Sequence, residues 1–384
     1  MSASSPWRHP VSPISDAERL QRLARLRERM EAAGIGGLLL GSTESLRYFT
    51  GLVWHASERL CGALVTKDRL VYVVPGFERS RVETLPRLDA EIATWEEDEE
   101  PTALVAKLLG PKGTLALDGQ LPLFLYHRLA QSLGAERLLD GAPLIASLRM
   151  RKSAAEVALI QYAMDLTLDV HRVAHAAMKP GVRASEIVSL IDSEHRKRGA
   201  DDGSSFCIVS FGVATSLPHG ADGDQVLKAG DLILVDTGCH IGGYCSDLTR
   251  TYTLEEPSSE IARIWNIERE AQQAVFEAAR IGAPCEALDA AARRVIEAHG
   301  LGPDYRVPGL PHRAGHGLGL NIHEEPYIVR GNRTLLEPGM CFSNEPMILV
   351  PDAFGVRLED HIVMTESGPR WFTQPSTSPT KPFG

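Results

Sequence analysis

The segment that most constrains the fold is residues 232–252, LILVDTGCHIGGYCSDLTRTY, which has the pattern of a β-hairpin. An apolar run ending at Asp236 predicts a buried strand, and a second β-rich run follows Asp247. A two-residue loop at Ile241 and Gly242 would place the two aspartates directly opposite each other. Opposed like charges destabilise a sheet, so the pair predicts a bound cation. On this segment alone, a turn aspartate and a solvent-facing one explain the pattern equally well.

A second predicted hairpin carries Glu345 and Glu359. Its turn is expected at residues 351–353, and a loop centred on Asp352 would oppose the two glutamates. His316 lies between the two hairpins, in GHGLGLNIHEEP. Four carboxylates and one imidazole form an oxygen-dominated donor set that suits two hard or borderline divalent ions. The four negative charges also balance two dications.

Composition excludes several kinds of partner. The chain has 384 residues, enough for two domains, and its formal net charge of −10 argues against nucleic acid or an anionic membrane as the main partner. No apolar run approaches the roughly 18 residues of a membrane span. The N-terminal segment lacks the apolar core of a signal peptide. The six cysteines show no zinc or disulfide spacing, which favours a reducing cytoplasm.

The order of predicted elements divides the chain into two domains. S-x-x-E capping boxes at Ser15 and Ser153 predict the first helix of each domain. The first domain alternates strands and helices, which predicts an α/β fold without a chemical motif of its own. The expected parts are a disordered tail (1–14), the α/β domain (15–147), the domain with both hairpins (148–373) and a Pro/Ser/Thr tail (374–384).

The second domain contains a weak internal repeat. Gly181 and the predicted helix after it recur 101 residues later at Gly282. The Leu-x-x-Gly segment before Asp236 recurs 109 residues later before Glu345. The repeat predicts two helix–helix–hairpin halves related by a pseudo-twofold axis, each supplying one acid pair.

These residues resemble the complete ligand set of the "pita-bread" metallopeptidases, family M24, over about residues 150–372. The domain before them resembles that of the Xaa-Pro peptidases and creatinases, the M24B branch, and methionine aminopeptidases lack it. The resemblance implies an α/β N-terminal domain of the creatinase/prolidase type. It also implies an α+β pita-bread catalytic domain with a pseudo-twofold repeat, and a homodimer.

The resemblance implies a role for each ligand. Asp236 would bind one metal, Asp247 and Glu359 would bridge both, and His316 and Glu345 would complete the second. The expected cofactor is a pair of divalent ions, Mn²⁺ first, with Co²⁺, Zn²⁺ and Fe²⁺ as alternatives. Such ions activate water, and Glu345 is the expected proton shuttle to the proline nitrogen.

Three histidines and an arginine complete the implied site. His219, His312 and His323 are expected to line the pocket and to donate to the substrate carbonyl or the tetrahedral intermediate; structural roles are the alternative. Arg357 matches an arginine that orients the glutamates, and a surface strand arginine is an equal alternative. Leu349 stands where many relatives carry a tyrosine, so any step that uses that hydroxyl is in doubt.

The implied function is hydrolysis of the Xaa-Pro bond in di- or oligopeptides, with release of the N-terminal residue. We favour a dipeptidase (prolidase) over an aminopeptidase P, because the N-terminal domain is compact. Arg47 and Arg59 are candidates to hold a dipeptide's carboxylate, although solvated surface charge is the preferred explanation. A creatinase-like hydrolase or a binding protein on this fold would have eroded ligands, and these are intact. A metal-dependent enzyme acting on a small metabolite stays open.

Overall fold

The computed structural model describes residues 7, 9–218 and 220–383. The chain divides into two compact units: Ile14–Arg149 forms most of the first, and the chain from Met150 onwards, together with the described residues of 8–13, forms the second. Residues 1–6 and 8 of the expected N-terminal tail lie outside the described residues.

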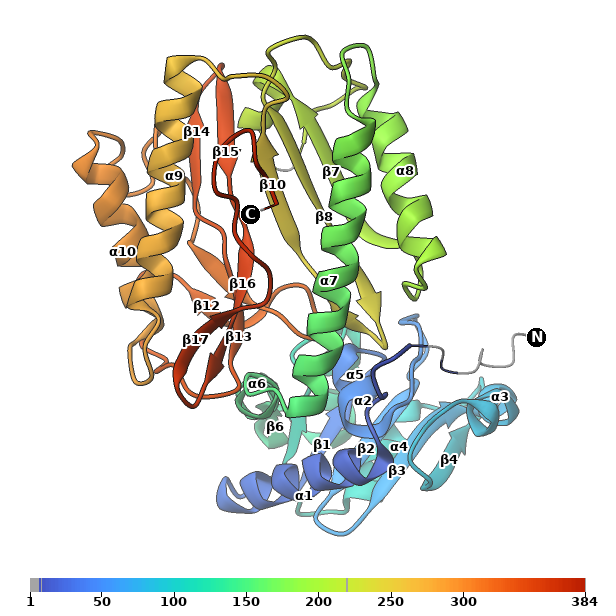
Figure 1. Cartoon of the computed structure of the whole chain (residues 1–384). Helices are drawn as coiled ribbons and strands as arrows, with labels where there is room; N and C mark the ends of the chain where they lie inside the picture. Colours follow the sequence, from blue (N-terminus) through green and yellow to red (C-terminus); the bar gives the residue numbers. More distant parts are fainter. Residues whose placement is uncertain (1–6, 8, 219, 384) are drawn as a thin grey trace. The chain divides into compact units, whose positions relative to one another are not determined.

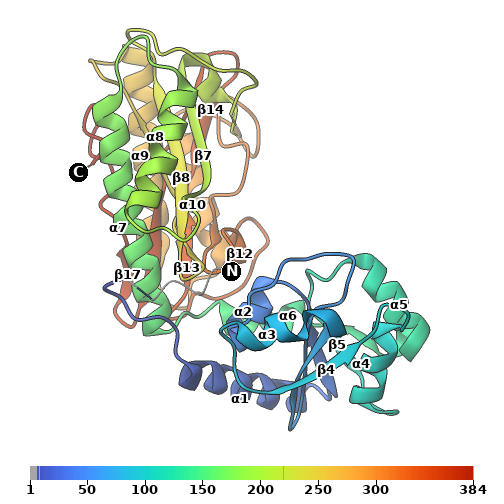
Figure 2. The same ribbon diagram turned by 90° about the vertical axis from the view of Figure 1, so that its right-hand side faces the viewer.

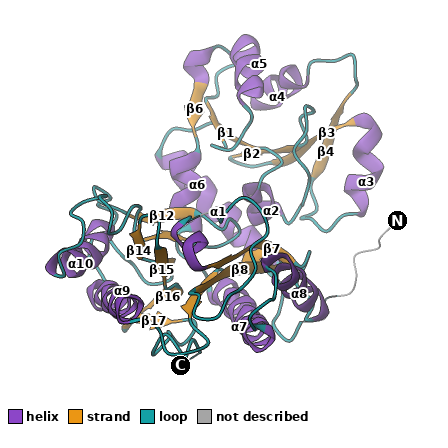
Figure 3. Cartoon of the chain, turned by 90° about the horizontal axis from the view of Figure 1, so that it is seen from above, coloured by secondary structure: helices purple, strands orange, loops and turns teal. Residues whose placement is uncertain are grey.

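The first unit is a six-stranded sheet with helices on both faces (Figure 3). The strand order is β4-β3-β2-β1-β5-β6, with β2 antiparallel to both neighbours and the other pairs parallel. The strands are β1 (Gly37–Leu40), β2 (Gly62–Thr66), β3 (Leu70–Pro75), β4 (Glu91–Trp95), β5 (Leu115–Leu117) and β6 (Leu138–Asp140). The helices are α1 (Asp16–Ala32), α2 (Glu44–Thr50), η1 (Gly76–Glu78), α3 (Arg79–Thr84), α4 (Pro101–Leu109), α5 (Leu123–Leu133), η2 (Ala135–Arg137) and α6 (Ala142–Arg149). The predicted α/β class is confirmed.

The second unit consists of two halves, each with two helices packed on its strands (Figures 1 and 2). The first half contains α7 (Ala154–Ala177), α8 (Ala184–Lys197), β7 (Ser204–Phe211), η3 (Gly212–Ser216), β8 (Ile233–Ile241), β9 (Tyr244–Cys245) and β10 (Leu248–Tyr252). The second contains α9 (Ser259–Ala278), α10 (Cys285–Ala298), β11 (Gly315–Gly317), β12 (Glu324–Ile328), β13 (Cys341–Asn344), β14 (Met347–Val350), β15 (Phe354–Arg357), β16 (Asp360–Thr365) and β17 (Gly368–Trp371).

Backbone hydrogen bonds repeat at the predicted offsets of 101 and 109 residues. The Gly181 N–H donates to the Leu227 carbonyl, and the Gly282 N–H donates to the Leu336 carbonyl, both at 2.8 Å. The return bonds, from Leu227 and Leu336 to the residue after each glycine, are both 2.9 Å. The two glycines have φ of +95° and +80°, a conformation that favours glycine. The predicted internal repeat is therefore confirmed.

Both helices that open the two halves begin at a serine cap. At α7 the capping box forms as predicted: Ser153 Oγ accepts from the Glu156 N–H at 3.2 Å, and Glu156 Oε2 accepts from the Ser153 N–H at 2.9 Å. At α9, Ser258 Oγ accepts from the Ile261 N–H at 3.3 Å, and no glutamate returns the bond. The first of the two helix starts is thus the more completely capped.

The segment expected to be a C-terminal tail packs on the second unit up to Phe383. The Thr253 N–H donates to the Pro379 carbonyl at 2.9 Å. Ser376 is buried, and its carbonyl accepts from Arg269 Nε at 3.0 Å. The ring of Phe383 packs against that of His175. The described part of this segment belongs to the folded unit.

The hydrophobic core of the second half lies between α9, α10 and its strands. Trp265 of α9 is buried there beside Phe342 of β13 and Met347 of β14. The indole of Trp265 donates to the Thr251 carbonyl of β10 at 2.8 Å, which ties this core to the first half. Within the described part of the chain, every helix is too short or too polar to cross a bilayer.

Candidate metal centre

The five predicted donors lie where the strands of the two halves meet. Asp236 is on β8, Asp247 immediately precedes β10, and His316 is on β11. Glu345 follows β13, and Glu359 precedes β16. Thr249 and Glu359 form an antiparallel bridge between the halves, in which the Glu359 N–H donates to the Thr249 carbonyl at 3.2 Å. Figure 1 shows β10 running beside β15 and β16 at this seam.

The register of the first hairpin differs from the predicted one. Its turn is the Gly-Gly pair at 242–243, so Asp236 pairs with Thr249 and the predicted opposition to Asp247 is wrong. The two glycines have φ of +57° and +81°, as a type I′ turn requires, and the β-branched Ile241 adopts such angles poorly. Asp247 is instead a diagonal neighbour of Asp236 on the same sheet face.

The second hairpin has the predicted register. β14 pairs with β15 and β13 pairs with β16 in one continuous register around the three-residue loop 351–353. That register places Glu345 opposite Glu359, in the short gap between the two ladders. The prediction of an opposed glutamate pair is therefore confirmed.

His316 lies among the carboxylates. Its Nε2 is 3.1 Å from Glu345 Oε1 and 3.8 Å from Asp247 Oδ2. Its Nδ1 donates to the Gly317 carbonyl at 3.0 Å, so Nε2 is the nitrogen that can bind a metal. Donor atoms lie within 4.8 Å of one another in three sets: Asp247, His316 and His323; Asp247, Glu359 and His361; His316, Glu345 and Glu359.

Burial controls the ionisation of the carboxylates. It raises the pKa of Asp236, and it raises the pKa values of Asp247 and Glu359 well above their usual range, with the neighbouring carboxylates adding to the effect. Burial also opposes ionisation of Glu345, but the adjacent His316 outweighs it and lowers the pKa of that carboxyl. Metal binding at this cluster is therefore coupled to proton release.

Unpartnered buried atoms show that these residues fit metal ions. Among the described residues, Asp236 Oδ1 and Glu359 Oε1 are buried and have no hydrogen-bond partner. Leaving a buried polar atom unsatisfied costs about 1–3 kcal/mol, and more for a charged one. A divalent cation would satisfy these oxygens and offset the charge of the carboxylates around them.

Two hydroxyl groups that the sequence did not single out hold the glutamates. Thr249 Oγ1 donates to Glu359 Oε2 at 2.7 Å, and Ser343 Oγ donates to Glu345 Oε1 at 3.1 Å. Each hydroxyl lies two residues from a predicted ligand, Asp247 or Glu345, and so faces the same side of its strand. That spacing is the signal by which the sequence could have identified them.

Arg357 is buried and contacts an aspartate directly. Its Nη2 is 2.5 Å from Asp236 Oδ2, its Nε donates to Thr249 Oγ1 at 3.2 Å, and its Nη1 donates to the Pro218 carbonyl at 3.3 Å. The alternative of a surface arginine is wrong, because the residue is 6 % exposed. Its carboxylate partner is Asp236, whereas the expected partners were the glutamates.

The predicted histidines are placed differently from one another. The ring of His323 is exposed and lies 4.0 Å from that of His316, centroid to centroid. His312 Nδ1 donates to the Arg313 carbonyl at 2.6 Å, and its buried Nε2 has no partner among the described residues. Burial lowers the pKa of His312, and Glu345 is its main charged neighbour. His219 lies outside the described residues.

Other residues discussed from the sequence have ordinary structural contacts. Arg59 of the first unit is partly exposed and pairs with Glu58 and Glu97, which agrees with solvated surface charge. Leu349 packs on the core, and its N–H donates to the Gly309 carbonyl at 3.0 Å. Position 349 of β14 therefore carries no hydroxyl group.

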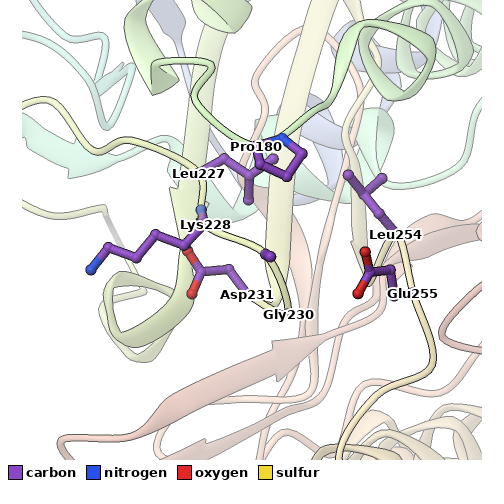
Figure 4. A pocket seen from close by; sticks show the side chains of 8 residues that line it. Pro180, Leu227, Lys228, Gly230, Asp231, Leu254 and Glu255 are labelled. Carbon is purple, nitrogen blue, oxygen red and sulfur yellow. Dashed lines mark hydrogen bonds between the residues drawn. The ribbon is translucent and has the colours of Figure 1, made fainter.

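Two hollows contain none of the five predicted donors. One, of about 20 Å³, is lined by Pro180, Lys228, Asp231 and Glu255 and could hold about one water molecule (Figure 4). The other, of about 300 Å³, lies within the first unit between Asp118, Tyr126 and Leu139. Neither hollow offers the donor set found at the seam.

Comparison with known families agrees with this geometry. Residues 158–366 match metallopeptidase family M24, and residues 22–151 match the creatinase/prolidase N-terminal domain. The probable dipeptidase PepE of Mycobacterium bovis is 35 % identical over 359 residues, which span 91 % of this chain and 92 % of the relative.

Solved structures of similar length share the fold. Dipeptidase PepE from Mycobacterium ulcerans superposes with a TM-score of 0.88 at 32 % identity, covering 94 % of this chain and 97 % of that one. An Xaa-Pro dipeptidase from Bacillus anthracis gives a TM-score of 0.82 at 30 % identity, covering 92 % and 97 %. The pita-bread fold expected for the second unit is confirmed.

Proposed function

We propose, on the premise that this chain belongs to metallopeptidase family M24, that it is a two-metal Xaa-Pro dipeptidase. The observation that supports the proposal is the cluster at the seam: Asp247, His316, Glu345 and Glu359 belong to sets of donor atoms that lie within 4.8 Å of one another, and Asp236 lies on the neighbouring strand, opposite Thr249. Relatives described as dipeptidases match nearly the full length of both chains, which supports the same reaction.

The cluster suits a pair of divalent ions. Asp236, Asp247, His316, Glu345 and Glu359 would hold the two ions. We propose Mn²⁺ as the resident metal because oxygen donors outnumber nitrogen donors, with Co²⁺, Zn²⁺ and Fe²⁺ as competitors. When bound, such ions polarise a carbonyl and lower the pKa of water.

Glu345 is the proposed proton shuttle. Its Oε1 accepts from Ser343 and faces His316, and the residue is the least buried of the five donors. The nitrogen of an Xaa-Pro bond is a tertiary amide and leaves poorly until it is protonated. A carboxylate that accepts a proton at one stage and returns it to that nitrogen removes this obstacle.

The histidines divide the recognition of substrate between them. Because His312 Nδ1 donates to a carbonyl and burial keeps the ring neutral, its Nε2 is an acceptor. We therefore assign His312 to a donor on the substrate, such as its terminal ammonium, and not to the carbonyl role expected from the sequence. His323, exposed beside His316, keeps the expected role at the substrate carbonyl, and His219 stays a candidate for it. Arg357 fixes Asp236.

We also propose that the protein is a cytoplasmic homodimer. The six cysteines are all free, and burial raises the pKa of Cys61, Cys207, Cys285 and Cys341 to about 12, so these thiols resist oxidation. Unpaired thiols suit a reducing compartment. The dimer is carried over from the family resemblance.

The test is hydrolysis by metal-stripped protein reloaded with Mn²⁺. Ala-Pro and Met-Pro should be cleaved, whereas Ala-Pro-Ala and the control Ala-Ala should not. Cleavage of Ala-Pro-Ala would instead make the protein an aminopeptidase P. Asp247→Asn should reduce the bound metal and lower kcat by roughly 100-fold or more, while Asp98→Asn, at an exposed position, should change neither. If no dipeptide is cleaved with any of the four metals and Asp247→Asn leaves the metal content unchanged, the proposal is wrong.

A further inference from the structure

We propose that His361 is a sixth protein donor to this metal cluster and that it shifts the metal preference towards nitrogen-binding ions. The inference rests on the proposed metal centre and adds a residue outside the five-donor set. It begins from position: His361 is on β16, two residues after Glu359, and it pairs with Ser343 of β13. Side chains two residues apart share a strand face, so His361 is on the side that carries both glutamates.

The imidazole of His361 is buried beside the carboxylates. The residue is 0 % exposed, and its Nε2 is 4.0 Å from Glu359 Oε1. One ring nitrogen lies within 4.8 Å of donor atoms on both Asp247 and Glu359. The ring centroid is 6.1 Å from that of His316, and the two ring planes are inclined by 68°.

Neither ring nitrogen of His361 forms a hydrogen bond of normal length and angle among the described residues. An unsatisfied buried polar group costs about 1–3 kcal/mol, and a valine or leucine would fill the same space without that cost. Glu359 Oε1, the nearest carboxylate oxygen, is also unpartnered. One cation between them would satisfy both atoms.

A second imidazole changes the chemistry of the set. The five predicted donors supply one nitrogen ligand, and His361 makes two. Imidazole favours Co²⁺, Zn²⁺ and Fe²⁺ over Mn²⁺, because these ions bind nitrogen more strongly. His361 therefore raises the affinity for the later metals more than that for Mn²⁺, at the ion held by Asp247 and Glu359.

The test measures metal binding without reference to catalysis. Metal-free wild type, His361→Leu and His361→Gln are titrated with Co²⁺, Zn²⁺ and Mn²⁺ against a competing chelator, and the Co²⁺ absorption spectrum is recorded. His361→Leu should weaken Co²⁺ and Zn²⁺ by roughly tenfold or more and Mn²⁺ by much less, and it should alter the Co²⁺ bands. His299→Leu, at an exposed histidine paired with Glu270, should leave all three affinities unchanged.

The conservative variant keeps the test decisive if the leucine variant fails to fold. His361→Gln retains a side-chain donor of similar length and should lose less Co²⁺ affinity than His361→Leu. An unchanged ratio of Co²⁺ to Mn²⁺ affinity in whichever variants fold would overturn the proposal, since a packing role predicts that result. If wild type binds two metals and shows the His361 effect yet cleaves no Xaa-Pro dipeptide, the dipeptidase proposal fails and this one stands.

Discussion

The two halves of the catalytic unit share a hydrogen-bonding scaffold but compensate their buried acids differently. In the first half, Asp236 is neutralised by the guanidinium of Arg357, which comes from the second half. In the second half, Glu345 is matched by His316 of the same half. The two halves thus share their backbone geometry, but a different group offsets the charge of the buried acid in each half.

The same contrast appears behind the strands. His171 of α7 donates from Nε2 to the Leu248 carbonyl at 3.1 Å, next to Asp247. Gln272 of α9, 101 residues later, donates from Nε2 to the Leu358 carbonyl at 3.2 Å, next to Glu359. Both side chains are buried and hold the strand that carries the second acid of their half. Only the histidine can take up a proton, so a fall in pH can break this contact in the first half but not in the second.

The largest expected effect comes from removing the guanidinium of Arg357, which pairs with Asp236 of the first half. Arg357→Met leaves Asp236 buried without its partner, and breaking a buried ion pair in this way costs about 3–5 kcal/mol. Chemical denaturation of the protein in chelator should show this loss of unfolding free energy, and saturation with Mn²⁺ should reduce it because the ions replace the missing charge. Arg330→Met removes an exposed pair with Asp304 and should cost less than about 1 kcal/mol. A loss in Arg357→Met no larger than this control would show that the pair does not stabilise the seam.

A smaller effect is expected from the pH sensitivity of His171. Burial, with a contribution from Arg250, lowers the pKa of His171 to about 3. The unfolded chain takes up this proton below about pH 6.5 and the folded chain does not, so stability present above that pH is lost as the pH falls. At pH 5 this one group lowers the free energy of unfolding by about 2 kcal/mol.

The matched variant is His171→Gln, which copies the second half. Between pH 7.5 and pH 5 it should lose about 2 kcal/mol less unfolding free energy than wild type, measured by denaturation in chelator. His171→Leu should show the same reduced pH dependence with a lower stability throughout, because it lacks the hydrogen bond. Equal losses in wild type and His171→Gln would remove the histidine from the explanation of acid sensitivity.

The smallest effect distinguishes the two helix starts. Ser153→Ala removes one bond of a reciprocal capping box and should cost about 1 kcal/mol. Ser258→Ala removes a single, longer cap and should cost about 0.5 kcal/mol. Thermal unfolding of the two variants in parallel measures the difference, and a larger loss at Ser258 would contradict the ranking.

Turn chemistry explains why one hairpin register was predicted correctly and the other was not. The second depends only on an odd loop between two apolar runs, and the glutamates are opposed as expected. The first depends on which two residues occupy the turn. A type I′ turn needs two positive φ angles, so the Gly-Gly pair at 242–243 takes it and Ile241 stays in the strand. The shift replaces Asp247 with Thr249 opposite Asp236.

The sequence by itself determined the donor types, the repeat and the family, because spacing along strands and helices dictates which side chains share a face. The tertiary structure alone decided which distant groups meet. Arg357 reaches Asp236 across 121 residues, and Thr249 holds Glu359 across 110. His361 becomes a candidate ligand only once its ring is seen to be buried without a partner. Local sequence patterns do not predict these contacts, because the contacts join hairpins from the two halves and depend on how those hairpins pack against each other.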